Sequence, residues 1–466
     1  MEITNEQMQE WLNCGDSKEY FELLKFVTVG AEASRLRDCV QCATWLKKWL
    51  REIGAEAELI LPAGKAASHP VPVLFAEIKG EEGSPTVLFY GHYDVQPADP
   101  VDKWETPPFE PSFRDGRVYC RGAQDDKGQF FAFLCGVREY LKSGKKNVNL
   151  KILLEGQEES GSTGLFSLLE ESSFRRRLAS DVLLVCDTSA AADLRPAIVA
   201  GIRGVNHFTV KLTAASRDLH SGEYGGVAPN AAQGMCELLS SLHAPDGSIA
   251  VEGFLDGVEE PSAEELEKSS AAFKTEEDAR KAVEKDIGAP PSGGERIKTI
   301  ARRLGFEPTV EINGVHSGYG GPGSKTVIPC EAIAKISTRL VPGQNPRRTF
   351  DALKEHFQKH CPEGMKVSFP EDSGLSSAMK LPVSSPIFAV AEEALTEMDS
   401  RGPIYQWSGA SIPVVSALKE TSGAAALLVG WGQPCDCIHS PNESFSVRQF
   451  LLAKEWAKRI LEKLQY

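Results

Sequence analysis

Histidine and carboxylate side chains that could bind a metal ion follow one apolar run of the sequence. Residues 86–90 are apolar enough for a buried strand, and His92 and Asp94 come directly after them. Because residues two apart on a strand point to the same face, one of the pair could bind a metal ion while the other supports the imidazole. His-x-Asp is also common in surface turns. The pair therefore indicates a metal site only if other segments supply further ligands.

More acidic residues stand at comparable places along the first half of the chain. Each follows a predicted strand (150–154 or 182–186) or precedes an apolar helix pattern that starts near residue 128; they are Asp125, Asp126, Glu158, Glu159 and Asp187. Strands that alternate with helices predict a largely parallel sheet, in which ligands gather beyond the carboxyl ends of the strands. We therefore expect these carboxylates to converge with His92 in a metal site. Taken singly, each cluster is equally typical of a solvated acidic loop.

The hydrophobic pattern predicts an α/β fold that is interrupted by an α+β segment. In the first part we expect strands 57–60, 71–78, 86–90, 150–154 and 182–186, and helices at 38–52 and after 128. The interrupting segment has predicted strands 205–212, 309–312 and 332–340, helices 229–242 and 348–357, and a charged helical stretch at 255–300. The chain then returns to α/β character with helix 387–398, strand 424–429 and helix 447–464. The predicted domains are therefore a catalytic α/β domain built from 1–203 and 383–466, with 204–382 inserted.

The composition limits which functions the protein can have and in which cellular compartment we expect it. The chain has 466 residues, of which 41% are hydrophobic and 25% charged, with a net charge of −14. This acidic balance argues against binding to nucleic acid, and no stretch approaches the roughly eighteen apolar residues of a membrane span. The N-terminus is acidic and lacks the apolar core of a signal peptide. Eleven scattered cysteines, an odd number, indicate reduced thiols. We therefore expect a cytoplasmic protein that binds neither nucleic acid nor membranes.

Five motifs occur in one order along the chain, at 91–96, 122–128, 158–162, 187 and 439–443. Together they resemble the M20 metallopeptidase family, and within it the cytosolic dipeptidase and carnosinase-like branch. The resemblance covers about residues 20–460, and it includes the segments 255–300, 326–329, 339–342 and 409–413. It implies a zinc-exopeptidase-like α/β/α catalytic domain with an inserted α+β lid, through which two subunits form a homodimer.

The resemblance also implies two divalent metal ions per subunit that share one ligand. His92, Asp125 and Asp187 would hold one ion. Asp125, Glu159 and His439 would hold the other, so that Asp125 bridges the two.

The chemistry of amide hydrolysis explains why such a set of groups is needed. Two cations roughly 3.5–4 Å apart can bind a shared water, lower its pKa and polarise a carbonyl. Three carboxylates and two neutral imidazoles leave a net charge near +1, and their many oxygens favour Zn²⁺, with Mn²⁺ or Co²⁺ possible. The resemblance implies Glu158 as the general base and Asp94 as the residue that orients His92. We interpret Cys435 and Cys437 as spectators, because the carboxylates already complete both metal sites.

Four residues of the inserted segment and its surroundings are implied to act on the substrate. His220, within the motif 217–222, would reach the active site of the partner subunit and stabilise the tetrahedral oxyanion. Arg339 would pair with a substrate carboxylate, and Thr326 and Ser411 would line the peptide-binding site. From the residues alone, His220 is equally typical of a turn, and Arg339 of a surface strand.

These observations predict a metal-dependent hydrolase that cleaves dipeptides or short peptides with a free C-terminal carboxylate. The alternative within the same machinery is an N-acyl amino acid deacylase, which acts on acetyl- or succinyl-amino acids. A non-catalytic binding protein on this scaffold would be expected to lack the base or a ligand, and none is missing. The chain departs from carnosinases in one respect: they carry a further substrate-contacting histidine in the return segment of the lid, whereas residues 375–390 of this chain contain none. The resemblance therefore does not extend to β-alanyl-histidine specificity.

Overall fold

The structure is a computed structural model that describes residues 3–62, 64–191, 193–409 and 412–464. The chain forms two compact units. Unit 1 comprises residues 1–200, 381–405 and 414–466, and unit 2 comprises residues 201–380 and 406–413. Within the described residues, no helix is both long and apolar enough to cross a membrane.

The core of unit 1 is a mixed sheet whose strands run in the order β1–β2–β6–β3–β7–β17–β8. Their bounds are β1 Glu56–Ile60, β2 Val73–Ile78, β3 Thr86–His92, β6 Asn149–Glu155, β7 Val182–Val185, β17 Ala425–Leu428 and β8 Ala197–Ile202. The central strands β6, β3, β7 and β17 are mutually parallel, whereas β1, β2 and β8 pair antiparallel. The central strands read as continuous apolar runs because both faces of a parallel sheet are covered.

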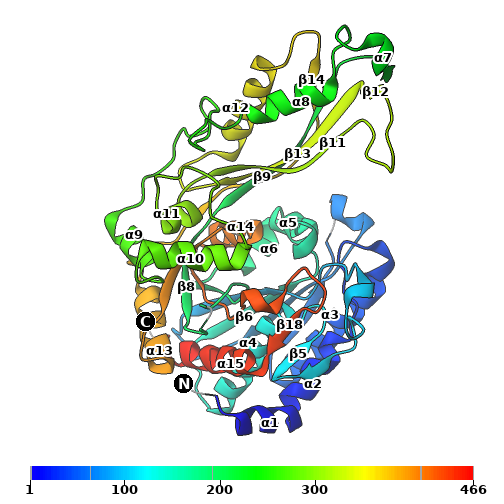
Figure 1. Ribbon diagram of the computed structural model, residues 1–466. Helices are drawn as coiled ribbons and strands as arrows, with labels where there is room; N and C mark the ends of the chain where they lie inside the picture. The colour runs from blue at the N-terminus through cyan, green and yellow to red at the C-terminus, as the bar shows by residue number, and fades with distance from the viewer. Residues whose placement is uncertain (1–2, 63, 192, 410–411, 465–466) are drawn as a thin grey trace. The chain divides into compact units, whose positions relative to one another are not determined.

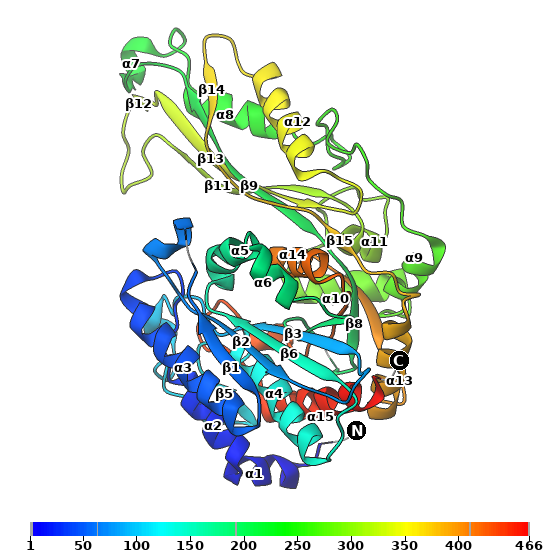
Figure 2. The same cartoon turned by 180° about the vertical axis from the view of Figure 1, so that it is seen from behind.

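Helices cover both faces of this sheet (Figures 1 and 2). On one face lie α3 Leu36–Glu52, α4 Lys127–Lys142 and α15 Val447–Lys463, where the ring of Phe133 stacks on that of Phe89 of β3 with 3.9 Å between centroids. On the other face lie α5 Thr163–Leu169, α6 Ser172–Arg177 and α14 Pro413–Ser422, and Phe174 of α6 packs against Phe75 of β2. The predicted α/β fold is therefore confirmed.

The remaining elements of unit 1 lie at its N-terminus and around the sheet. The helices are α1 Asn5–Asn13, α2 Gly15–Leu24 and α13 Pro386–Met398. A separate three-stranded sheet, in the order β18–β5–β4, joins Ser444–Ser446 to Arg117–Tyr119 and Ser112–Arg114. The sheet order continues from β8 to β15 Met379–Lys380, which belongs to unit 2, and β16 Ile404–Ser408 also pairs with β8.

Unit 2 is built on a four-stranded antiparallel sheet in the order β11–β13–β9–β14. Its strands are β11 Thr309–Ser317, β13 Glu331–Leu340, β9 Gly204–Thr213 and β14 Lys366–Ser376. The helices α8 Ala231–Ser240 and α12 Pro346–Lys359 pack on one face, where Phe208, Met235 and Phe350 share an apolar core (Figure 1). The unit also contains α7 Ser221–Tyr224, α9 Ala263–Ser270, α10 Glu276–Ile287, α11 Ile300–Gly305 and a ribbon of β10 Leu219–His220 with β12 Val327–Ile328.

Most predicted elements are present with shifts of a few residues at their ends. The predicted strand 71–78 begins at Val73, after Pro72, which has no N–H to donate to a ladder. The predicted strand 309–312 continues to Ser317, with a register shift between Ile312 and Gly314. The predicted helix 229–242 is shorter because Asn230 caps it, accepting from the N–H groups of Ala232 and Gln233.

Candidate metal centre

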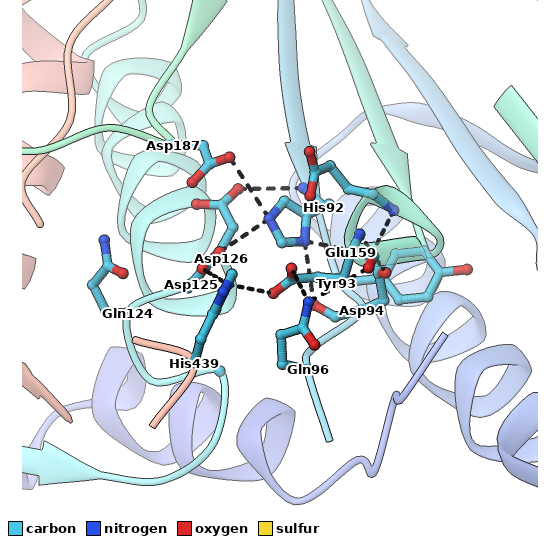
Figure 3. Close-up of polar contacts among 12 residues, drawn as sticks. His92, Tyr93, Asp94, Gln96, Gln124, Asp125, Asp126, Glu159, Asp187 and His439 are labelled. Atoms are coloured by element: carbon cyan, nitrogen blue, oxygen red, sulfur yellow. Dashed lines mark hydrogen bonds and ion pairs between the residues drawn. The ribbon is translucent and has the colours of Figure 1, made fainter. Parts of the chain in front are cut away.

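The central strands of unit 1 deliver the predicted ligands to one edge of the sheet (Figure 3). His92 is the last residue of β3, and Glu159 lies in the 3₁₀ turn Glu158–Ser160 that follows β6. Asp187 follows β7, and Asp125 stands two residues before the start of α4. His439 comes from the loop between β17 and β18. Parallel strands that end at the same edge thus bring together residues that are far apart in the sequence.

Two groups of three potential ligands share Asp125. His92, Asp125 and Asp187 form the first group, and in each group one ligand atom per residue lies within 4.8 Å of the others. The Nε2 atom of His92 is 3.2 Å from Asp125 Oδ1 and 3.7 Å from Asp187 Oδ2. In the second group, Nε2 of His439 is 2.9 Å from Asp125 Oδ2 and 3.2 Å from Glu159 Oε1. The two imidazoles therefore face opposite oxygens of one carboxylate.

The carboxylate of Asp94 connects His92 to the turn that carries the two glutamates. Its Oδ1 lies 3.4 Å from Nδ1 of His92, on the side of the ring away from Asp125. Its two oxygens also accept hydrogen bonds from the backbone N–H groups of Glu158 and Glu159, both at 3.1 Å. Asp94 is fully buried, so it fixes both the ring and the turn.

The electrostatic balance of the cluster reflects several carboxylates close to two imidazoles. Burial would lower the pKa of His92, but the carboxylates of Asp125 and Asp94 raise it well above its ordinary value. Hydrogen bonds to Asp125 and Glu159 raise the pKa of His439 to about 10. Burial and the charge of Asp125 raise the pKa of Asp187 to about 7. Without a cation, the cluster therefore tends to bind protons.

Glu158 stands beside the two groups without belonging to either. Burial raises the pKa of its carboxyl well above the usual range, with Asp187 and Asp94 adding to the rise and His92 opposing it. A raised pKa brings a carboxyl group towards the range in which it can both accept and return a proton. Glu158 therefore differs from its neighbour Glu159, which belongs to the second group of potential ligands.

The donor set fits divalent cations. Among the described residues, the buried atoms His92 Nε2 and Glu159 Oε1 make no well-aligned hydrogen bond. Buried polar atoms are rarely left in that state unless another partner is present. Imidazole nitrogens and carboxylate oxygens at this spacing are the usual ligands of Zn²⁺ and related ions. Cys435 and Cys437 are exposed free thiols that join neither group.

Two buried carboxylates to which the sequence assigned no role, Glu443 and Asp436, hold the loops of this site. The carboxylate of Glu443 accepts hydrogen bonds from Arg121 and from the loop that contains Asp125. Asp436 accepts from Gln433 N–H and Gln449 Nε2, and it pairs with Arg117, which anchors the loop of His439. Arg117 and Arg121 are more than 300 residues from these carboxylates in the sequence, so no local pattern predicts the two pairs.

The predicted substrate residues of unit 2 fall into two places. His220 ends β10 and Thr326 directly precedes β12, with 3.4 Å between Nε2 and Oγ1. Arg339 is on β13, in register with Thr309 of β11 and Val205 of β9, and burial lowers its pKa. Ser411 lies outside the described residues.

Comparison with known proteins agrees with this geometry. The model of peptidase family M20/M25/M40 matches residues 88–463. The human Beta-Ala-His dipeptidase is 31% identical over 402 residues, which cover 83% of this chain and 76% of that protein. The Cys-Gly metallodipeptidase dug1 of Schizosaccharomyces pombe is 30% identical over 395 residues, covering 82% and 80%. The crystal structure of an M20 family metallo-carboxypeptidase from Sulfolobus solfataricus superposes with a TM-score of 0.82 at 28% identity, covering 97% of this chain and 99% of that one.

The chain belongs to the M20/M25/M40 peptidase family. The family resemblance inferred from the five motifs is thereby confirmed.

Proposed function

We propose that this protein is a dinuclear metallopeptidase that hydrolyses dipeptides or short peptides with a free C-terminal carboxylate. The observation that carries the proposal is the pair of three-residue groups that share Asp125, with Glu158 beside them. The human and the Schizosaccharomyces pombe relatives described above are both named as dipeptidases. Among the described residues of the site, none favours the N-acyl amino acid deacylase alternative.

The roles of the residues in unit 1 follow from their positions. His92, Asp125 and Asp187 would hold one cation, and Asp125, Glu159 and His439 the other. Two divalent cations, with Zn²⁺ first and Mn²⁺ or Co²⁺ as alternatives, supply polarisation of the scissile carbonyl and acidify the attacking water.

Proton transfer in the reaction is assigned to Glu158. Glu158 would take a proton from the attacking water and deliver it to the leaving amine. Asp94 would keep the imidazole of His92 and the turn of Glu158 in place through the three contacts described above.

The function is tested with metal-depleted protein and a panel of substrates. The panel contains Cys-Gly, β-Ala-His, other dipeptides, and acetyl- and succinyl-amino acids. We expect no dipeptide hydrolysis after depletion and recovery on adding Zn²⁺ or Mn²⁺. Equal activity with a chelator present throughout would overturn the proposal, and faster cleavage of acyl-amino acids than of any dipeptide would replace it with the deacylase.

The residues of unit 2 are assigned to substrate binding in a homodimer. We propose that the inserted segment 204–382 serves as lid and dimerisation domain, and that His220 stabilises the oxyanion in the partner subunit's active site. Arg339 would pair with the C-terminal carboxylate of the substrate, and Thr326 and Ser411 would line the same site. A half-buried arginine with a desolvated guanidinium is suited to bidentate carboxylate binding.

Subunit mixing tests the assignment of His220. Glu158→Ala and His220→Ala subunits are each expected to be nearly inactive. In a mixed dimer, one active site has both an intact Glu158 and an intact His220 from the other subunit, so partial activity should return. No recovery in verified heterodimers would show that His220 does not act across the dimer.

A cytoplasmic location is part of the same proposal. All eleven cysteines are free thiols, including the exposed Cys236, Cys435 and Cys437. Free surface thiols persist in a reducing compartment. Imaging of the tagged full-length chain in its native cell would test this, and secretion would contradict it.

A further inference from the structure

The carboxylate of Glu443 is surrounded by hydrogen-bond donors from the segment that leads to Asp125. Oε1 accepts from the backbone N–H groups of Gln124 at 3.0 Å and Asp125 at 3.1 Å. Oε2 accepts from Nη1 of Arg121 at 2.7 Å and from the N–H of Gly122 at 2.9 Å. Four donors thus converge on one side chain that lies more than 300 residues further along the chain.

Burial raises the pKa of Glu443, whereas Arg121 and the N–H groups of Gly122 and Asp125 oppose that rise by stabilising the ionised carboxylate. Glu443 is 0% exposed and Arg121 is 1% exposed. All four partners are donors, so each oxygen accepts twice and a proton on either oxygen would take the place of one of these hydrogen bonds. A buried charge needs such partners, because an ionised group without them is strongly destabilised in the protein interior. Arg121 and three backbone N–H groups together provide that compensation.

We propose that Glu443 is a positioning residue for the metal centre, which acts by holding the backbone of Gln124 and Asp125. Asp125 must present its two oxygens to two different imidazoles, 3.2 Å from His92 Nε2 and 2.9 Å from His439 Nε2. Its side chain can do so only if its own backbone is fixed, and the direct restraint on that backbone N–H is Glu443. The inference rests on the proposed function, because it gives Asp125 the role of bridging ligand.

The Glu443→Gln variant tests this with almost no change in shape. The NH₂ group of the glutamine would face the N–H groups of Gln124 and Asp125 in one orientation, and those of Arg121 and Gly122 in the other. In either orientation, two hydrogen-bond donors would point at an NH₂ group that is itself a donor. We expect Zn²⁺ affinity, measured by competition with a chromophoric chelator, to fall about 10–100-fold, as is typical when a partner of a metal ligand is lost. The absorption spectrum of the Co²⁺-loaded protein should also change, because the geometry at Asp125 changes.

A matched control separates positioning from general loss of stability. Glu265 of α9 is also a buried carboxylate, which accepts from Ser262 N–H at 2.8 Å and pairs with Lys380 at 2.9 Å, but it lies in unit 2. Glu265→Gln is expected to lower the thermal midpoint of the metal-free protein while leaving Zn²⁺ affinity and the Co²⁺ spectrum unchanged. If Glu443→Gln does not fold, the same measurements are made on Glu443→Asp. This variant keeps the negative charge but withdraws it from the N–H groups by one methylene.

The outcomes distinguish this inference from the proposed function. Wild-type protein that binds two Zn²⁺ ions, with weaker binding and an altered Co²⁺ spectrum in the Glu443 variant, supports both. If the wild type binds two Zn²⁺ ions and the Glu443 variant has the same Zn²⁺ affinity and Co²⁺ spectrum, only the positioning role is overturned. Wild-type protein that binds no metal overturns the proposed function, and the positioning role with it.

Discussion

The Nδ1 atom of His220 accepts a hydrogen bond from the backbone N–H of Gly222 at 3.0 Å. Because Nδ1 is an acceptor, the neutral ring carries its proton on Nε2. That nitrogen faces Oγ1 of Thr326 at 3.4 Å, which is a long contact. The local backbone therefore selects the tautomer in which Nε2 can donate to a substrate oxygen.

Replacing His220 should lower turnover with little effect on metal binding. We expect His220→Ala to reduce kcat by about 10²–10³, the usual cost of losing one donor to an oxyanion. Steady-state kinetics on the best dipeptide, with metal content measured alongside, would check this. His316→Ala removes an exposed histidine of β11 in the same unit and should behave as wild type. Wild-type kcat in His220→Ala would contradict the donor role.

Exchanging Glu158 and Glu159 separately for glutamine should give two different defects. Glu158→Gln loses the proton acceptor, so kcat should fall about 10²–10⁴-fold while two metal ions still bind. Glu159→Gln removes a carboxylate from the second group of ligands and should lower the metal content instead. Kinetics and metal analysis of both variants would separate the roles. Identical defects in the two variants would show that the two adjacent glutamates do not have separate roles in proton transfer and metal binding.

The ends of the central strands were predictable because buried parallel strands have a simple signature. Residues 86–90, 150–154 and 182–186 are mostly apolar runs, and each coincides with a strand of the sheet, although β7 ends at Val185. The polar residues that follow such runs must lie at one edge, which is where His92 and Asp187 are. This part of the site could therefore be inferred from strand order alone.

Other parts of the fold were missed for physical reasons. The strand β14 lies at the edge of its sheet, contains Pro370 and has two register shifts, so it lacks regular alternation. The short strands β4, β5 and β18 are three residues each, and their sheet is completed only where β18 meets β5 from a distant segment. Glu443 belongs to the motif 439–443 in the sequence, but nothing in the sequence assigns it a role. Its importance comes from contacts with Arg121 and Gly122 that exist only in the folded chain.

Removing the charge of Asp94 should disturb the metal centre and the turn of Glu158 together. In Asp94→Asn, one oxygen becomes an NH₂ group that opposes the N–H of either Glu158 or Glu159. We expect metal affinity to fall about 10–100-fold, and kcat to stay below wild type even at saturating metal. Titration of the apo protein followed by kinetics in excess Zn²⁺ measures both effects. Full recovery of kcat with added metal would show that Asp94 serves only the ligand His92.

Metal binding at neutral pH should release protons. In the metal-free protein, hydrogen bonds to Asp125 and Glu159 raise the pKa of His439 to about 10, so the ring is protonated at pH 7. A metal ligand must be neutral imidazole, and this proton has to leave. Asp187, with its pKa raised to about 7 by burial and Asp125, releases a further fraction. Because protons compete with the metal below these pKa values, apparent affinity should rise with pH, about tenfold per unit for each proton released.

Calorimetry of Zn²⁺ binding at pH 7, in buffers with different ionisation enthalpies, counts the released protons. The wild type should release at least one, and His439→Ala about one fewer. His356→Gln is the matched control: burial lowers the pKa of His356 to about 4, so this ring is already neutral at pH 7. Its replacement should leave the proton count unchanged. A binding enthalpy that does not depend on the buffer would mean that His439 is already unprotonated at pH 7, and would contradict the raised pKa on which this prediction depends.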